Sequence, residues 1–220
     1  MHMLEAACLC LITQGMARAQ SNIENKRGGP SSPTEQELKS LPPYCTARLS
    51  MSKPLANEEQ IKRWQNILGD AFLHIHHYCN GLNFLNRIHR AIGDKNYLLG
   101  RALQNFQYMY RIPENHFLRP ELELNIGQVH YMADQIPQAM ASFRKAIQMK
   151  PSYERAYLLL SFCFRRVGDR TSAVRALQEG LTKVPDSRAL QNALRWMNSA
   201  NDKPAPLRID NQKEPRAPDW

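Results

Sequence analysis

Histidine and cysteine crowd one short stretch of this sequence, residues 74–79. His74 and His77 are three residues apart, so on a helix they share one face. Two imidazoles on one face, with a thiolate from Cys79 or Cys45, are ligand types that transition metals and haem iron accept. However, neither Cys-x-x-Cys-His nor His-Glu-x-x-His occurs in the chain. We therefore favour histidines that pack in a core or bond to the backbone, and we keep a metal or haem site as the alternative.

Three cysteines follow the first twenty residues: Cys45, Cys79 and Cys163. Cys45 ends an extended Leu-Pro-Pro-Tyr-Cys segment, and Cys79 lies at the end of a predicted helix. In an oxidising compartment, a Cys45–Cys79 disulfide would fasten that segment to the helix. Spacing alone leaves open two free buried thiols. Cys163 lies between two phenylalanines inside another predicted helix, which indicates a buried free thiol.

Motifs for catalysis or for cofactor binding are missing from the sequence. It contains no Gly-rich phosphate loop, no Gly-x-Ser-x-Gly elbow and no kinase signature. Acidic residues fall mainly at positions predicted to be exposed, and a Cys79 nucleophile beside a histidine is the one enzymatic alternative. We therefore predict a non-enzymatic protein with no cofactor and no small-molecule substrate.

The chain is basic, and its charge is dispersed. It has 220 residues, a net charge of +9 and an estimated pI of 9.5. Glu and Asp stand between the basic residues, and no block of five or six like charges occurs. This pattern favours an acidic protein partner over nucleic acid. No run approaches the roughly 20 apolar residues that a membrane-spanning helix needs.

The two ends of the chain read as processing and linker segments. An apolar run, Ala6–Ile12, precedes Ala17-Arg18-Ala19, whose small residues suit signal peptidase and would leave Gln20 as the new terminus. However, no Lys or Arg precedes the apolar run, and Glu5 stands there instead. An ordinary amino terminus that is not a signal peptide is therefore the alternative. We therefore predict a signal peptide over 1–19 and a periplasmic or secreted protein. Polar compositions predict a flexible linker over 20–40 and a disordered tail over 200–220.

Residues 41–81 predict a loop followed by one long helix. Asn57 is a good cap for a helix from Glu58 to Tyr78, and apolar residues recur along it at helical spacing.

A 34-residue period organises the second half of the chain. Four pairs of similar residues are 34 apart: Ala139 and Ala173, Phe143 and Leu177, Ala146 and Gly180, Pro151 and Pro185. Small residues allow close helix approach, bulky apolar residues fill the space between helices, and Pro ends a helix. With this spacing, residues 120–153 and 154–187 resemble two tetratricopeptide repeats of the exported bacterial type. We predict a degenerate repeat over 82–119 and a capping helix over 188–199.

The resemblance implies an all-α fold, with antiparallel helix pairs stacked as a short superhelix. It also implies a concave face that binds a peptide of another protein. The positions that usually line this face, with their neighbours, are Asn125, Gln128, Tyr131, Arg155, Leu158, Phe162, Arg165 and Arg166. Leu158 and Phe162 stand where a carboxylate clamp would need polar groups, so we expect a partner with an apolar anchor and an acidic flank. The predicted function is a scaffold or adaptor in the bacterial cell envelope.

Overall fold

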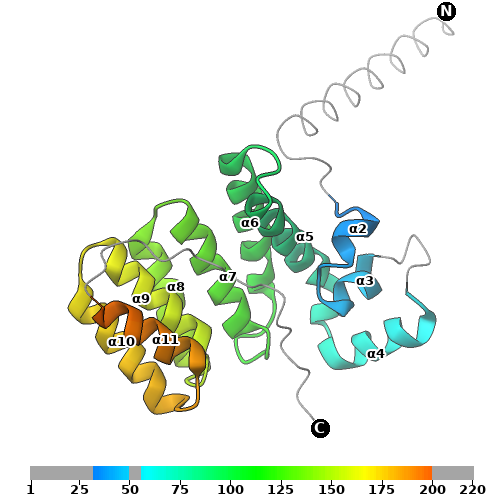
Figure 1. Ribbon diagram of the computed structural model, residues 1–220. Helices are drawn as coiled ribbons and strands as arrows, with labels where there is room; N and C mark the ends of the chain where they lie inside the picture. The colour runs from blue at the N-terminus through cyan, green and yellow to red at the C-terminus, as the bar shows by residue number, and fades with distance from the viewer. Residues whose placement is uncertain (1–31, 50–55, 200–220) are drawn as a thin grey trace, which may run out of the picture.

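The computed structural model describes residues 32–49 and 56–199, and every regular element in these ranges is a helix. The α-helices are α2 (Glu35–Leu38), α3 (Pro43–Leu49), α4 (Glu58–Leu68), α5 (Ala71–His89), α6 (Lys95–Tyr108), α7 (Arg119–Met132), α8 (Ile136–Met149), α9 (Glu154–Arg166), α10 (Arg170–Lys183) and α11 (Arg188–Asn198). A short 3-10 helix, η2 (Met109–Arg111), follows α6. Consecutive long helices pack side by side, so the predicted all-α class is confirmed (Figure 1). The signal peptide, most of the linker and the tail lie outside the described residues.

Side-chain caps explain where several helices begin. Asn57 accepts a hydrogen bond from the backbone N–H of Gln60, and the Gln60 side chain accepts one from the Asn57 backbone N–H. Asp94, Asp169 and Ser187 cap α6, α10 and α11 in the simpler one-bond form.

The single helix predicted over 58–78 is wrong, because the chain turns between α4 and α5. Gly69 has φ +54°, a left-handed conformation that ends α4 after the buried Leu68. The apolar periodicity continues through this break, so periodicity alone did not reveal it. A new helix, α5, starts at Ala71 and runs for 19 residues.

Helices α5 and α6 form a pair whose internal contact repeats that of α7 and α8. A Cβ built on Gly81 would lie 2.6 Å from the Phe106 ring, and one built on Gly127 would lie 2.5 Å from the Phe143 ring. The two glycines therefore let these helix pairs approach closely. The degenerate repeat predicted over 82–119 began too late, because its first helix starts at Ala71.

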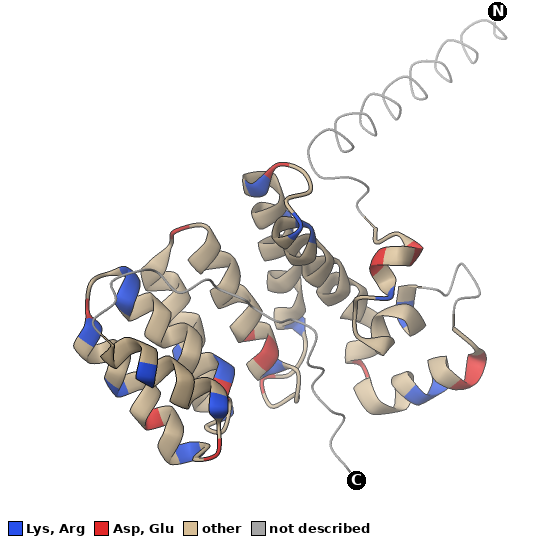
Figure 2. Ribbon diagram, viewed as in Figure 1, with Lys and Arg blue, Asp and Glu red and all other residues tan. Residues whose placement is uncertain are grey.

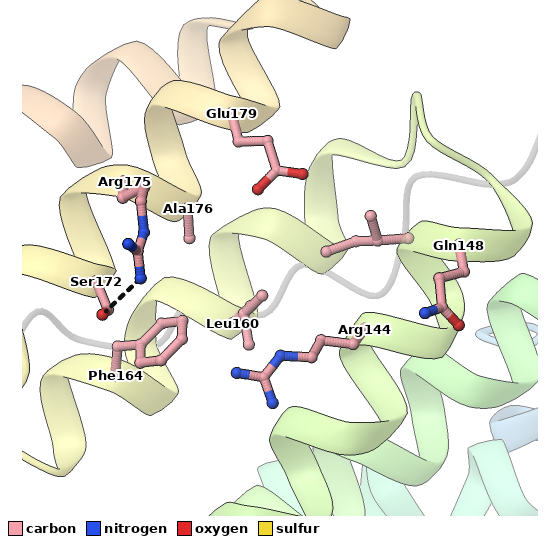
Figure 3. Close-up of a pocket in the computed structure, with 9 residues that line it drawn as sticks. Arg144, Gln148, Leu160, Phe164, Ser172, Arg175, Ala176 and Glu179 are labelled. Atoms are coloured by element: carbon pink, nitrogen blue, oxygen red, sulfur yellow. Dashed lines mark hydrogen bonds between the residues drawn. The ribbon is translucent and has the colours of Figure 1, made fainter.

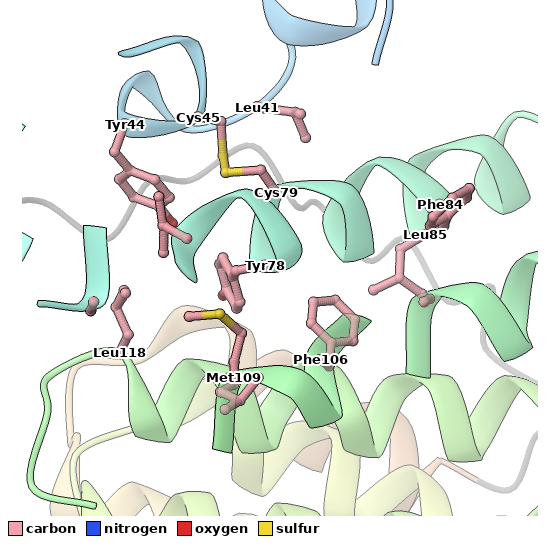
Figure 4. Packing of buried hydrophobic residues seen from close by; sticks show 14 of the residues in the cluster. Leu41, Tyr44, Cys45, Tyr78, Cys79, Phe84, Leu85, Phe106, Met109 and Leu118 are labelled. Atoms are coloured by element: carbon pink, nitrogen blue, oxygen red, sulfur yellow. A yellow bond between two sulfur atoms is a disulfide. The ribbon is translucent and has the colours of Figure 1, made fainter. Parts of the chain in front are cut away.

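The segment before α4 belongs to the first core rather than to a linker. Leu38, Leu41 and Tyr44 pack with Tyr78 and Phe106 in one buried cluster (Figure 4). Thr34 and Glu37 form a capping box that starts α2. Glu37 also pairs with Arg87, whose side chain is 3% exposed, at 2.6 Å. The linker predicted over 20–40 therefore extends too far, because Glu37 pairs with Arg87 of α5 and Leu38 belongs to the first core.

A disulfide joins Cys45 on α3 to Cys79 on α5, as predicted (Figure 4). Both cysteines are fully buried, and Arg48 on α3 also donates to the backbone carbonyls of Phe72 and Leu73. α3 is therefore fixed to α5 covalently and by hydrogen bonds.

Two smaller cores hold the C-terminal helices together. One, around Phe143 and Leu160, joins α7, α8 and α9. The other, around Tyr157 and Leu177, is closed by Leu190 and Met197 of α11. α11 thus covers the end of the stack, which is what a capping helix does in a repeat array.

Candidate protein-binding surface

The candidate surface lies on the first helices of the pairs. α7 packs against α5 on one side and α9 on the other, and α11 packs against α9. We call the side formed by α7, α9 and α11 the first-helix face. The sequence analysis predicted that the first helices form the partner-binding face.

Asn125 and Gln128 are interior residues, so their assignment to the binding surface is wrong. The Asn125 Nδ2 donates to the Tyr78 hydroxyl at 2.8 Å, and the Gln128 Nε2 donates to the Asn125 Oδ1 at 3.1 Å. Both side chains are at most 2% exposed. Tyr78 of α5 thus reaches α7 and is itself buried.

Arg155 belongs to a second cluster of polar side chains, which lies at the start of α9 and includes Tyr153 and Glu121. The Tyr153 hydroxyl donates to Glu121, and the Arg155 guanidinium lies 3.9 Å from the same carboxylate. Burial and the nearby Glu121 charge raise the pKa of Tyr153, so its hydroxyl stays neutral. Arg155 thus contributes to the α7–α9 contact as well as to the surface.

Half-buried apolar side chains remain on the C-terminal part of the first-helix face. Tyr131, Leu158 and Phe162 are each partly exposed. Phe162 contacts the apolar clusters on both sides of α9. Leu158 and Phe162 are four residues apart, so they stand one turn from each other on α9.

Charged and aromatic side chains border these residues. The Arg165 guanidinium lies 3.8 Å from the centroid of the Trp196 ring on α11, a cation–π contact. Arg166 pairs with Asp134 at 3.0 Å, and both are exposed. Trp196 was missed by the sequence analysis. It follows Ala189 and Ala193 at i, i+4, i+7 spacing, a signal that could have found it. We define the first-helix patch as Tyr131, Leu158, Phe162, Arg165, Arg166 and Trp196.

The last repeat and the cap carry an excess of positive charge. Residues 154–199 contain eight Lys and Arg but four Asp and Glu. Figure 2 shows these basic positions on α9, α10 and α11 around the ends of the helices. This end of the stack therefore carries a net positive charge.

The histidine stretch does not form a ligand set. The His77 ring stacks on Tyr108 at 3.7 Å, and its Nδ1 lies 3.2 Å from the Asn105 Oδ1. His74 also meets the Tyr108 ring, while Cys79 is used in the disulfide. Burial lowers the pKa of His76 to about 4 and that of His77 below its ordinary value. Among residues 32–49 and 56–199, no group of three His, Cys, Asp or Glu side chains is placed to hold a metal ion.

Cys163 is buried inside α9 and is not bridged. Burial raises the pKa of its thiol to about 12, so little thiolate exists near neutral pH. This environment does not suit a nucleophile.

A comparison with protein families identifies the repeats in the second half of the chain. The family model for tetratricopeptide repeats matches residues 130–197, which run from the end of α7 to α11. Residues 130–197 of this chain are therefore similar to tetratricopeptide repeats. Repeats of this kind are typically non-catalytic interaction domains, so the protein is built as a scaffold for protein–protein contact.

Two solved structures show similar helix arrangements. One is the TPR2B domain–pHsp70 complex of yeast Sti1, at 18% identity, covering 56% of this chain and 94% of that chain with a TM-score of 0.46. The other is the crystal structure of MamA, at 15% identity, covering 63% of this chain and 74% of that chain with a TM-score of 0.46. No curated protein matches this chain. Among the described helices, none is long and apolar enough to cross a membrane.

Proposed function

We propose that this protein is a tetratricopeptide-repeat adaptor of the bacterial cell envelope that binds a peptide segment of another protein on the first-helix patch. One observation carries the proposal: Tyr131, Leu158 and Phe162 leave apolar surface half-exposed on two neighbouring first helices. An apolar anchor of the partner would contact these three side chains, because binding energy concentrates in a few central residues. Buried Asn125 and Gln128 have no part in it.

Arginines at the border of the patch favour an acidic flank on the partner. Arg165 and Arg166 lie one turn or less from Phe162 on α9, within the basic C-terminal part of the stack. Such border charges mainly speed the encounter of two proteins and contribute less to holding them together. We therefore assign the anchor to the apolar residues and the steering to the arginines.

Site-specific photo-crosslinking in the native host tests the surface. A photoreactive phenylalanine analogue at Tyr131 should form a discrete adduct with one partner, and the same analogue at the exposed Arg63 on α4 should not. Phe162→Ala should reduce the Tyr131 adduct at least tenfold, because loss of a central anchor costs about 2 kcal/mol or more. Circular dichroism and melting must match between the variants. A Tyr131 adduct that Phe162→Ala leaves unchanged would contradict the proposed surface.

The envelope location rests on the sequence of the amino terminus and on the disulfide. Ala17-Arg18-Ala19 fits a signal-peptidase site, and a buried structural disulfide is typical of oxidising compartments. Terminal sequencing of the protein from its native host should give Gln20 as the first residue. An intact Met1 on cytoplasmic protein would contradict export without affecting the proposed binding surface.

A further inference from the structure

A cavity of about 330 Å³ opens on the other side of α9, between α8 and α10. Leu160 and Phe164 of α9 line it, and Ala176 of α10 closes one wall (Figure 3). Leu160 and Phe164 are each two residues beyond Leu158 and Phe162, so they point about 200° away from them around α9. The cavity, which we call the outer pocket, is therefore separate from the first-helix patch.

Two arginines border the outer pocket. Arg144 comes from α8, and its guanidinium lies 5.7 Å from the centroid of the Phe164 ring. Arg175 comes from α10 and donates to the Ser172 hydroxyl at 3.2 Å. In Figure 3 both guanidinium groups lie on the Phe164 side of the pocket, and the Glu179 carboxylate lies away from both.

Neither guanidinium forms a direct ion pair with a carboxylate in the part of the chain that the structure describes, although Asp169 is close enough to Arg175 for their charges to interact. The ion pairs found there involve other arginines and one lysine. The lining of the cavity is mixed, with two cationic groups beside the apolar side chains of Leu160, Phe164 and Ala176. Such a lining matches a ligand with a carboxylate beside an apolar side chain. Guanidinium groups bind carboxylates with charge-assisted hydrogen bonds.

We propose that the outer pocket binds a peptide segment of a partner protein in which Asp or Glu adjoins a Leu-sized side chain. The carboxylate would lie between Arg144 and Arg175, and the apolar side chain would contact Leu160 and Ala176. Ligand sites usually have volumes of about 300–1,000 Å³, and the outer pocket lies at the lower end of this range. It therefore has room for one or two side chains. Because this site and the first-helix patch occupy opposite faces of α9, the protein can hold two partners at once.

Methyl NMR on the full chain tests this assignment with a defined probe. Acetyl-Gly-Asp-Leu-Gly-amide should shift the methyl signals of Leu160 and Ala176 and leave those of Leu158 in place. A dissociation constant on the order of 1 mM is expected from so few enclosed atoms. The matched acetyl-Gly-Asn-Leu-Gly-amide lacks the charge and should bind at least fivefold more weakly. Equal binding of the two peptides would overturn the role of the arginines.

Variants separate the outer pocket from the rest of the surface. Arg144→Gln with Arg175→Gln should weaken the aspartyl peptide at least tenfold, whereas Lys62→Gln with Arg63→Gln, which removes the same two charges on α4, should not. Both pocket arginines are exposed, so the fold should tolerate their loss. Ala176→Leu should fill the cavity and abolish the shifts.

Three results would overturn the proposal. They are unchanged peptide binding in the double arginine variant, peptide-induced shifts confined to Leu158, and sodium isovalerate binding as tightly as the peptide. The last would indicate a site for a small carboxylate rather than for a protein segment. The Tyr131 crosslink is expected to persist in the double arginine variant, so the two proposals fail independently.

Discussion

Two glycines set the distance between paired helices in this protein, and each faces a phenylalanine. Gly81 meets Phe106, and Gly127 meets Phe143, at separations that leave no room for a methyl group. Phe143 is fully buried, so its ring fills the space that the missing side chain leaves. The glycine and the phenylalanine of a pair thus act as one packing unit.

Substitutions at Gly127 and Phe143 test this unit. Phe143→Ala should lower the free energy of unfolding by about 3–5 kcal/mol, as for a buried aromatic. Gly127→Ala should lower it by about 1–3 kcal/mol through overpacking. In the double variant the Gly127→Ala penalty should shrink, because the ring that it meets is gone. Urea denaturation measures all three.

Gly100 provides the control for these substitutions. A Cβ there would meet nothing within 4 Å, and the residue lies in α6. Gly100→Ala should therefore stabilise by about 0.4–1 kcal/mol by restricting the unfolded chain. Strictly additive effects of Gly127→Ala and Phe143→Ala would show that the two residues do not form a unit.

Glu37 gives the stability of the protein an acid dependence. The hydrogen bond from Arg87, more than any other cause, lowers the pKa of Glu37 from 4.5 to about 2. A carboxyl whose pKa is lower in the folded state than in the unfolded state stabilises the fold. This contribution is fully present above the unfolded-state pKa and is lost as the pH falls through the folded-state pKa. Between pH 5 and pH 2, Glu37 should thus forfeit at most about 3 kcal/mol.

Denaturant titrations at pH 6 and pH 3 check the Glu37 prediction. The loss of stability between the two pH values should be smaller in Glu37→Gln than in the wild type. Glu35→Gln, an exposed acidic residue on the same helix, should keep the wild-type dependence. An unchanged acid dependence in Glu37→Gln would contradict the assignment.

At the scale of residues, the sequence predicted the disulfide and the buried thiol but misplaced two surface residues. The pairing of Cys45 with Cys79 is confirmed, but the predicted surroundings are wrong, because Cys45 lies in helix α3 rather than in an extended segment and Cys79 lies in the middle of α5 rather than at a helix end. Asn125 was misassigned because its partner, the Tyr78 hydroxyl, lies 47 positions earlier in the chain. No local pattern reports such a long-range hydrogen bond.

At the scale of elements, α3 is the piece that the disulfide secures. Its seven residues cannot form a stable helix alone, because isolated helices shorter than about 12–15 residues are marginal in water. The bridge to Cys79 spans 34 residues. Closing such a loop stabilises by about 3–4 kcal/mol in the chain-entropy account.

Removal of the bridge should therefore destabilise the protein while leaving the repeats helical. Cys45→Ser with Cys79→Ser should lower the free energy of unfolding by about 3–4 kcal/mol. Cys163→Ser, which touches no bridge, serves as the control for altered thiol content. Peptide mapping without reduction should find Cys45 linked to Cys79 and Cys163 unmodified. A bridge that contains Cys163 would contradict the assignment.

The elements were predictable where the 34-residue period holds and not where it fails. From Gly127 to Phe143 the chain advances 16 residues, but from Gly81 to Phe106 it advances 25. The nine extra residues lengthen the end of α5, its connection to α6 and the start of α6, so a search at period 34 misaligns this pair. The α5–α6 pair is recognisable only from the contact between Gly81 and Phe106, which is a feature of the folded structure and not of the sequence pattern.

At the scale of the whole molecule, stability should be uneven along the stack. The first core joins α2 through α7 and contains the disulfide, whereas the last core has five fully buried apolar residues around α9, α10 and α11. Repeat arrays open by parts, because each repeat contacts only its neighbours. The C-terminal end should therefore open at lower free energy than the centre.

Native-state hydrogen exchange measures this gradient. Amides of α10 and α11 should exchange at lower opening free energies than those of α5. Leu177→Ala should accelerate exchange in α9, α10 and α11 and leave α5 unchanged, because Leu177 belongs to the last core alone. Uniform acceleration through α5 would show that the stack unfolds as one unit.

The attachment of α3 to α5 also has a consequence in time. A ribosome adds about 5–20 residues per second, so Cys79 is made about 2–7 seconds after Cys45. During that interval the apolar side chains of Leu41 and Tyr44 have no surface to cover. The start of the described chain must then wait, unfolded, for helix residues that are still being synthesised. A newborn chain in this condition exposes apolar side chains that an early-binding chaperone can contact.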